Sequence, residues 1–292
     1  MTTSAPRPVE GRVAVEPGVA LRTLTWGTPD PERPSVLLVH GLASNAHLWD
    51  GVGAELARRG WHAVAVDQRG HGRSDRPDHG YDFGTIGGDL LAVMRHHHLV
   101  RPLAIGQSWG GNVVVELVWA HPDAALGAVA VDGGIIELGE RFERWEDCAC
   151  ALRPPALAGT PLKRFEAAVR AAHPDWPEAG IQGVLACFEV AEDGTIAPRL
   201  SLERHLAILE ALWHHRPSQR FADIERPVMF VLARAGEVAW VRDKEAAASA
   251  ALATLARGRV TWMHDAHHDL HAQKPVEFTD HVVAAWQEGF FT

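Results

Sequence analysis

The chain has 292 residues, of which 47% are hydrophobic and 22% charged, and its formal net charge is -9. This length and composition are typical of a globular protein that buries a large core. The acidic balance, with no long run of Lys or Arg, argues against nucleic acid as a partner and favours a small-molecule substrate.

The cysteines and the apolar runs bear on the compartment of the protein. There are three cysteines, and their spacings match neither a disulfide framework nor a zinc site. The first residues, "MTTSAPRPVEGR", lack the apolar core of a signal peptide, and no later stretch has the roughly 18 unbroken apolar residues that a membrane span needs. We therefore expect a cytoplasmic protein that is not bound to a membrane.

Strand-like and helix-like patterns alternate along most of the chain. An opening hairpin is expected at 13–27, around Pro17-Gly18. The strands expected after it are 35–41, 62–67, 103–106, 126–134, 227–233 and 259–265. The helices expected between them are 48–60, 85–98, the stretch after 108, and 275–289. Continuous apolar strands that alternate with helices predict an α/β fold, with a parallel sheet covered by helices on both faces.

The alternation stops between 135 and 227. Helical patterns at 161–173 and 202–215 dominate this stretch, with a turn expected at 192–195. We predict a core domain made of 1–134 and 228–292, and a mainly helical cap at 135–227. The cap is expected over the carboxyl edge of the sheet, where open α/β sheets bind ligands.

The stretch "GQSWGG" at 106–111 places Ser108 between an apolar strand and a helix. A G-x-S-x-G motif in that context predicts a nucleophile elbow, a sharp turn that exposes the serine oxygen above the sheet. The amide of Trp109 would then lie at a helix N-terminus, directed at a developing oxyanion.

Four segments together carry a resemblance to a known family: "HGLASNAHLWD", "VDQRGHGRSDRP", "GQSWGG" and "HHDLHAQKPVEF". With them the chain resembles the α/β-hydrolase superfamily over nearly its whole length. The resemblance implies that the backbone amide of Leu42 completes the oxyanion hole, and it implies no metal and no organic cofactor. Epoxide hydrolases and haloalkane dehalogenases of this family carry aspartate at the nucleophile position. Ser108 instead indicates acyl transfer.

The general base is expected in "MHDAHHDLHAQKP", which contains four histidines. In the family pattern the catalytic histidine precedes the proline of the last helix by seven residues, and counting back from Pro275 gives His268. His267 is the nearest alternative. The segment follows a strand and reads as a loop, so the i, i+4 histidine pairs of a helical metal site are not expected.

The acid of the triad is not at its most frequent family position. That position, after the next-to-last strand, falls on Gly236. Two carboxylates could replace it: Glu237, one residue further on, or Asp132 at the end of an earlier strand. Both keep the chain order Ser, acid, His. We favour Asp132, because the end of a strand fixes geometry better than a displaced loop residue does.

The chain has eleven tryptophans and one tyrosine. Most tryptophans of a globular protein fill its core, but aromatic faces also suit apolar substrates. The candidate pocket residues are His40, Trp49, Trp145, Trp213 and Trp240.

The predicted function is a serine hydrolase that cleaves a small to medium apolar carboxylic ester or lactone. Thioester hydrolysis, carbon-carbon bond hydrolysis and aminopeptidase action use the same type of site. The displaced acid leaves open a second class of protein, a ligand receptor with little turnover.

Overall fold

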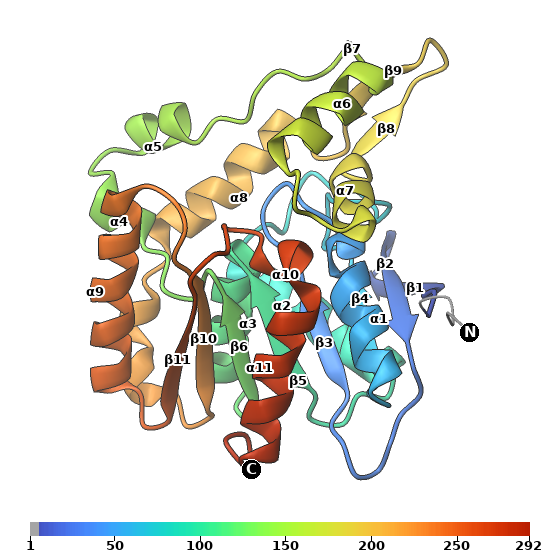
Figure 1. The fold of residues 1–292 in the computed structure, drawn as a ribbon. Helices are drawn as coiled ribbons and strands as arrows, with labels where there is room; N and C mark the ends of the chain where they lie inside the picture. The colour runs from blue at the N-terminus through green and yellow to red at the C-terminus, as the bar shows by residue number, and fades with distance from the viewer. Residues whose placement is uncertain (1–5) are drawn as a thin grey trace.

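A mostly parallel sheet of eight strands forms the centre of the computed structural model, which describes residues 6–292 (Figure 1). The strand order is β1-β2-β4-β3-β5-β6-β10-β11. The first two strands form the expected antiparallel hairpin, β2 pairs antiparallel with β4, and every later pair is parallel. The predicted sheet is therefore confirmed. The first five residues of the predicted core domain lie outside the described part.

The strands of this sheet lie close to their expected positions. They are β1 (Val9–Glu16), β2 (Val19–Trp26), β3 (Val36–Val39), β4 (Ala63–Val66), β5 (Leu103–Gln107), β6 (Gly127–Val131), β10 (Val228–Ala233) and β11 (Gly258–Met263). In β3, β4, β5, β6 and β10 every residue is buried. Continuous burial is what a parallel strand covered on both faces requires, and it explains why these strands read as unbroken apolar runs.

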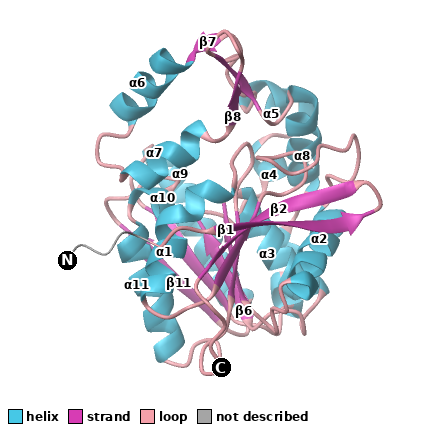
Figure 2. Ribbon diagram, turned by 90° about the vertical axis from the view of Figure 1, so that its right-hand side faces the viewer, coloured by secondary structure: helices cyan, strands magenta, loops and turns pink. Residues whose placement is uncertain are grey.

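Helices cover both faces of the sheet (Figures 1 and 2). One face packs against α1 (Asp50–Arg58) and α11 (Pro275–Gln287), and the other against α2 (Phe83–His96), α3 (Trp109–Ala120) and α9 (Val238–Thr254). Alternate residues of a strand supply opposite faces. In β3, Leu37 and Val39 join one apolar cluster, and Val36 and Leu38 join the other.

An insertion of helices and short strands separates β6 from β10. It contains α4 (Leu138–Arg141), α5 (Trp145–Ala151), β7 (Thr160–Pro161), α6 (Leu162–Ala172), α7 (Glu178–Leu185), β8 (Phe188–Val190), β9 (Thr195–Pro198), α8 (Leu202–His214) and the 3-10 turns η2 (Pro217–Gln219) and η3 (Phe221–Asp223). The two expected helices and the expected turn are present. The sequence prediction missed the small sheet β7-β9-β8, whose strands have two to four residues, too few to show an alternating pattern.

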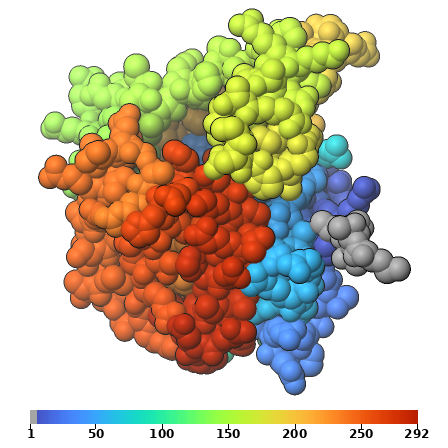
Figure 3. All heavy atoms as spheres, in the orientation of Figure 1, coloured from blue at the N-terminus to red at the C-terminus, as the bar shows by residue number. Residues whose placement is uncertain are grey.

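The insertion lies over one end of the sheet, the end at which the parallel strands finish (Figure 1). In Figure 3 the surface is hollowed between the green and the yellow-green parts of the insertion, above the orange and red C-terminal part of the chain. The loops that follow β3, β5, β6, β10 and β11 meet at this end of the sheet. Within residues 6–292, no helix has the length and apolar character needed to cross a membrane.

Candidate active site

Ser108 lies in the sharp turn between β5 and α3, and its backbone has φ +53° and ψ -120°. An L residue rarely adopts this conformation, which costs about 1–3 kcal/mol of strain and persists only where the surroundings enforce it. The two glycines of the motif let the turn pack closely against neighbouring backbone carbonyls. A Cβ on Gly110 would lie 2.5 Å from the carbonyl oxygens of Val39 and His40, and one on Gly106 would overlap the carbonyl of Gly110. Strand, turn and helix therefore have the geometry of a nucleophile elbow.

The loop after β3 passes directly beside the serine. A Cβ on Gly41 would lie 3.1 Å from Cβ of Ser108, so only glycine lets this peptide approach so closely. Within residues 6–292, neither the amide of Leu42, the next residue, nor that of Trp109 donates a hydrogen bond. Two free N–H groups on either side of a serine form the donor pair that an oxyanion hole needs.

His40 holds this loop in place. Its Nδ1 donates to the carbonyl of Gly41 at 2.8 Å, and its Nε2 accepts from the amide of Gln68 at 3.0 Å. Burial lowers the pKa of His40, in agreement with a neutral ring that uses one nitrogen as donor and the other as acceptor. His40 is fully buried and both of its nitrogens are bonded to the protein, so the structure places it behind the oxyanion loop rather than in a substrate pocket.

His268 and Asp132 come together at the carboxyl edge of the sheet. Nδ1 of His268 donates to Oδ2 of Asp132 at 2.7 Å, and the side chain of His268 is 54% exposed against 5% for Asp132. Asp132 directly follows β6 and has φ +42°. The side-chain amide of Gln107 donates to the carbonyl of His268 at 3.3 Å, which brings the histidine loop to the residue that precedes Ser108.

The charges of the pair reinforce each other. Desolvation acts to raise the pKa of Asp132, but the hydrogen bond and charge of His268 and the charge of Lys244 outweigh it, and the pKa is lowered. Desolvation acts to lower the pKa of His268, but the hydrogen bond that its ring donates to Asp132 and the charges of Asp269 and Asp132 outweigh it, and the pKa is raised. This arrangement stabilises an imidazolium next to a carboxylate, which is the state that forms when the histidine takes up a proton.

Within residues 6–292, no hydrogen bond or ion pair joins the side chains of the alternatives, Glu237, His264 and His267, to Asp132 or His268. Glu237 is exposed at the N-terminus of α9 and, within the described chain, makes no hydrogen bond or ion pair with a histidine. His264 and His267 are exposed. His271 is buried, and neither of its ring nitrogens has a partner in residues 6–292.

Sequence reasoning missed Lys244, which lies on the far side of the carboxylate. Its Nζ donates to Oδ1 of Asp132 at 2.8 Å and to the carbonyl of Ala233. Lys244 belongs to α9, a helix that was also not predicted. A lysine within a helix resembles any solvated lysine in the sequence, so no local signal could have identified it.

Residues 34–164 match the family model described as alpha/beta hydrolase fold. The chain has the α/β-hydrolase fold. Epoxide hydrolase B of Mycobacterium tuberculosis is 31% identical over 116 residues, which make up 39% of this chain and 33% of that protein. The similarity thus spans about a third of that relative's length.

Solved structures of low sequence identity share the fold over nearly the whole chain. E-2-(acetamidomethylene)succinate hydrolase superimposes with a TM-score of 0.78 at 20% identity, covering 95% of this chain and 98% of that one. The enol-lactonase from Burkholderia xenovorans LB400 has a TM-score of 0.69 at 21% identity, covering 94% and 99%. Likeness at these identities establishes the fold alone.

The tryptophans proposed for the pocket do not gather at one place. Trp49 is fully buried in the core, where its ring centre lies 4.1 Å from that of His271. Trp145 and Trp213 lie 6.2 Å apart in the insertion, both half-buried against the apolar cluster that also contains Trp109. Trp240 is 39% exposed on α9. Of the four, Trp145 and Trp213 lie in the insertion above the edge of the sheet that carries Ser108.

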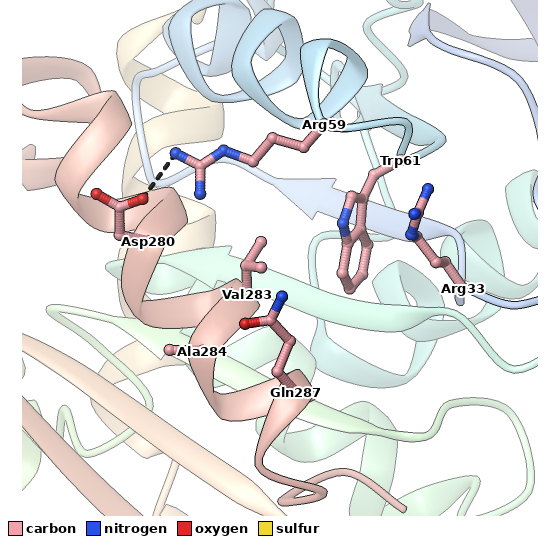
Figure 4. Close-up of a pocket in the computed structure, with 7 residues that line it drawn as sticks. All are labelled: Arg33, Arg59, Trp61, Asp280, Val283, Ala284 and Gln287. Carbon is pink, nitrogen blue, oxygen red and sulfur yellow. Dashed lines mark ion pairs between the residues drawn. The ribbon is translucent and has the colours of Figure 1, made fainter.

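A cavity of about 480 Å³ lies elsewhere, on the face formed by α1 and α11 (Figure 4). Its lining residues are Arg33, Arg59, Trp61, Asp280, Val283, Ala284 and Gln287. Arg59 is paired with Asp280 at 2.7 Å, and Trp61 is 2% exposed, so neither offers a free group to a ligand. No residue of the Ser108 site borders this cavity. Within residues 6–292 no group of His, Cys, Asp and Glu side chains is arranged to hold a metal ion.

Proposed function

We propose that this α/β hydrolase cleaves a small to medium apolar carboxylic ester or lactone through an acyl-enzyme at Ser108. The observation that carries the proposal is the 2.7 Å hydrogen bond between His268 and Asp132, beside an elbow serine flanked by two free amides. A serine hydroxyl is a weak nucleophile without a base, and a base needs a partner that fixes its tautomer.

The proposed roles follow from which atoms are free. Asp132 holds Nδ1 of His268, so Nε2 is the nitrogen available to take the Ser108 proton. The serine oxygen attacks the carbonyl, and the amides of Leu42 and Trp109 bind the oxyanion. The protonated His268 then donates its proton to the leaving alcohol. In the second half of the reaction, His268 takes a proton from the water that attacks the acyl-enzyme. It then gives that proton to the Ser108 oxygen as the bond to the acyl group breaks and the acid is released.

Epoxide opening, the activity named for a curated relative, fits this site less well. Attack of a carboxylate on an epoxide gives an ester, which water can hydrolyse. Attack of Ser108 on an epoxide would give an ether, which the same base and oxyanion hole could not release. The serine therefore favours substrates with an electrophilic carbonyl carbon.

We propose that residues 135–227 form a cap that covers this site. Two contacts support the proposal. The side-chain amide of Asn45, in the oxyanion loop, donates to the carbonyl of Gly183 at 2.8 Å. Gln273, just after the histidine loop, donates to the carboxylate of Asp175 at 2.6 Å. The half-buried Trp145 and Trp213 support an apolar substrate group beneath the cap.

The test is a screen of chromogenic esters, lactones and thioesters, together with labelling by a fluorophosphonate, on wild type and Ser108→Ala. We expect stoichiometric labelling of wild type, a burst on a p-nitrophenyl ester, and loss of both in the variant. Turnover of thioesters, of a dienoic diketone or of aminoacyl amides in preference to esters would replace the substrate class and leave the mechanism standing. An unlabelled wild-type protein without turnover would refute the hydrolase and leave a binding protein.

A further inference from the structure

Lys244 extends from α9 to the acid of the proposed triad. Its ammonium lies 2.8 Å from Oδ1 of Asp132 and also contacts the carbonyl of Ala233, and its side chain is 20% exposed. An ammonium largely shielded from water needs such partners, because desolvating an unpaired charge is costly. The contact therefore joins two groups that are both mostly shielded from solvent, and is unlike an exposed surface pair.

The two carboxylate oxygens of Asp132 accept hydrogen bonds from different groups. Oδ2 accepts from Nδ1 of His268 at 2.7 Å. Oδ1 accepts from the amide of Ala233 at 2.9 Å and from Lys244. The backbone of Asp132 has φ +42°, an uncommon conformation for a residue other than glycine. Because donors on β10 and α9 hold Oδ1, Oδ2 is turned toward the histidine.

Charged side chains of neighbouring segments affect the protonation of His268. Asp132 and Asp269 favour its cation, whereas Lys244 opposes it. Burial lowers the pKa of the nearby His271 to about 3, so that ring is neutral near neutral pH. The neighbours of Lys244 on α9 are engaged elsewhere, Asp243 with Arg141 and Glu245 with Arg234. Lys244 is thus the cation that α9 brings to the acid.

We propose that Lys244 is a positioning residue of the triad, whose ammonium fixes Asp132 and offsets part of its charge, so that His268 remains a neutral base at lower pH than it would beside an unopposed carboxylate. This inference rests on the proposed serine hydrolase function. An unopposed Asp132 would bind the imidazolium more strongly. Less of the enzyme would then hold the free base near neutral pH.

The test compares the pH dependence of kcat/KM in wild type, Lys244→Met and Lys244→Arg. In Lys244→Met we expect the acidic limb to move to higher pH by about one unit, and kcat at the plateau to fall about tenfold, because one charged hydrogen bond to Asp132 is lost. Lys244→Arg keeps a cation and is expected to hold the limb near its wild-type position. Lys163→Met removes the same charge from an exposed position on α6 and serves as the matched control.

The direction in which the acidic limb of kcat/KM moves in Lys244→Met distinguishes this role from a merely structural one. If Lys244 only supported the fold, its loss would loosen the contact between Asp132 and His268, and the limb would move to lower pH or stay in place. Either result would overturn the proposal. Lys244→Gln, which is neutral but keeps hydrogen-bond donors, provides a second variant should Lys244→Met fold poorly.

An NMR titration of the His268 imidazole supplies a readout that needs no turnover. Its signal is assigned by its loss in His268→Gln. A raised pKa of His268 in Lys244→Met, with wild type neither labelled by the fluorophosphonate nor active on any substrate of the screen, would uphold the electrostatic role and refute the hydrolase. If the pKa of His268 in Lys244→Met is unchanged or lowered and the wild-type enzyme is active, the hydrolase function stands and the proposed role of Lys244 is refuted.

Discussion

Replacing Asp132 with asparagine removes one oxygen and, in this structure, forces the orientation of the amide. Oδ1 faces two donors, the amide of Ala233 at 2.9 Å and the ammonium of Lys244 at 2.8 Å. The carbonyl oxygen of the asparagine must take that side, so its NH₂ group faces Nδ1 of His268. Nδ1 then accepts a hydrogen bond, and the ring proton moves to Nε2. That nitrogen is the one required to receive the Ser108 proton.

The expected loss in kcat is about 10⁴-fold, the size seen when a triad histidine is held in the wrong tautomer, and corresponds to about 5 kcal/mol. The assay is turnover of the best ester from the screen, with fluorophosphonate labelling of Ser108 measured in parallel. Glu237→Gln is the matched control, since Glu237 is exposed and, in the described chain, makes no hydrogen bond or ion pair with a histidine, and its kcat should equal that of wild type. An Asp132→Asn enzyme within threefold of wild type, or a large loss in Glu237→Gln, would refute the assignment of the acid.

Three further predictions follow from the site and its support. Activity depends on a neutral His268 whose pKa is raised, so kcat/KM should fall with decreasing pH along a limb whose midpoint lies above the ordinary value of 6.5; a limb well below it would contradict the pairing with Asp132. Gly110→Ala should destabilise the fold by about 3 kcal/mol in urea unfolding, because a Cβ there meets two carbonyl oxygens, whereas Gly87→Ala, with open space around it, should not destabilise. Burial lowers the pKa of His271 to about 3, so the unfolded chain takes up a proton there below 6.5 while the folded chain does not. The stability that wild type loses between pH 6.5 and 3 should be smaller in His271→Leu, and an equal pH dependence in the two proteins would contradict a buried neutral ring.

The central sheet and the elbow could be predicted because each has a signature within one stretch of chain. Buried parallel strands are unbroken apolar runs, and Gly106 and Gly110 stand where neighbouring carbonyls exclude a Cβ. The preference for Asp132 over Glu237 came from a physical argument about strand ends. In the structure, Asp132 directly follows β6 and reaches His268, whereas Glu237 is exposed.

What could not be predicted depends on contacts between distant segments or on weak local patterns. Helix α9 buries only Ala248 and Ala251, so it lacks the broad apolar stripe by which an amphipathic helix is recognised. Lys244 reaches Asp132 across 112 residues of sequence. The prediction that Trp49 lines a pocket was wrong, because Trp49 is fully buried in the core. Composition alone does not distinguish an aromatic ring in the core from one at a cavity wall.

Placing the acid after β6 leaves the connection after β10 without a catalytic group. Residues 236–240, which comprise the end of this connection and the first three residues of α9, are all exposed. Loop grafting and library mutagenesis could therefore be directed at this connection, provided that α9 keeps its register and Lys244 still reaches Asp132. For engineering, the fold offers here an exposed segment that can be altered without replacing any residue of the proposed triad.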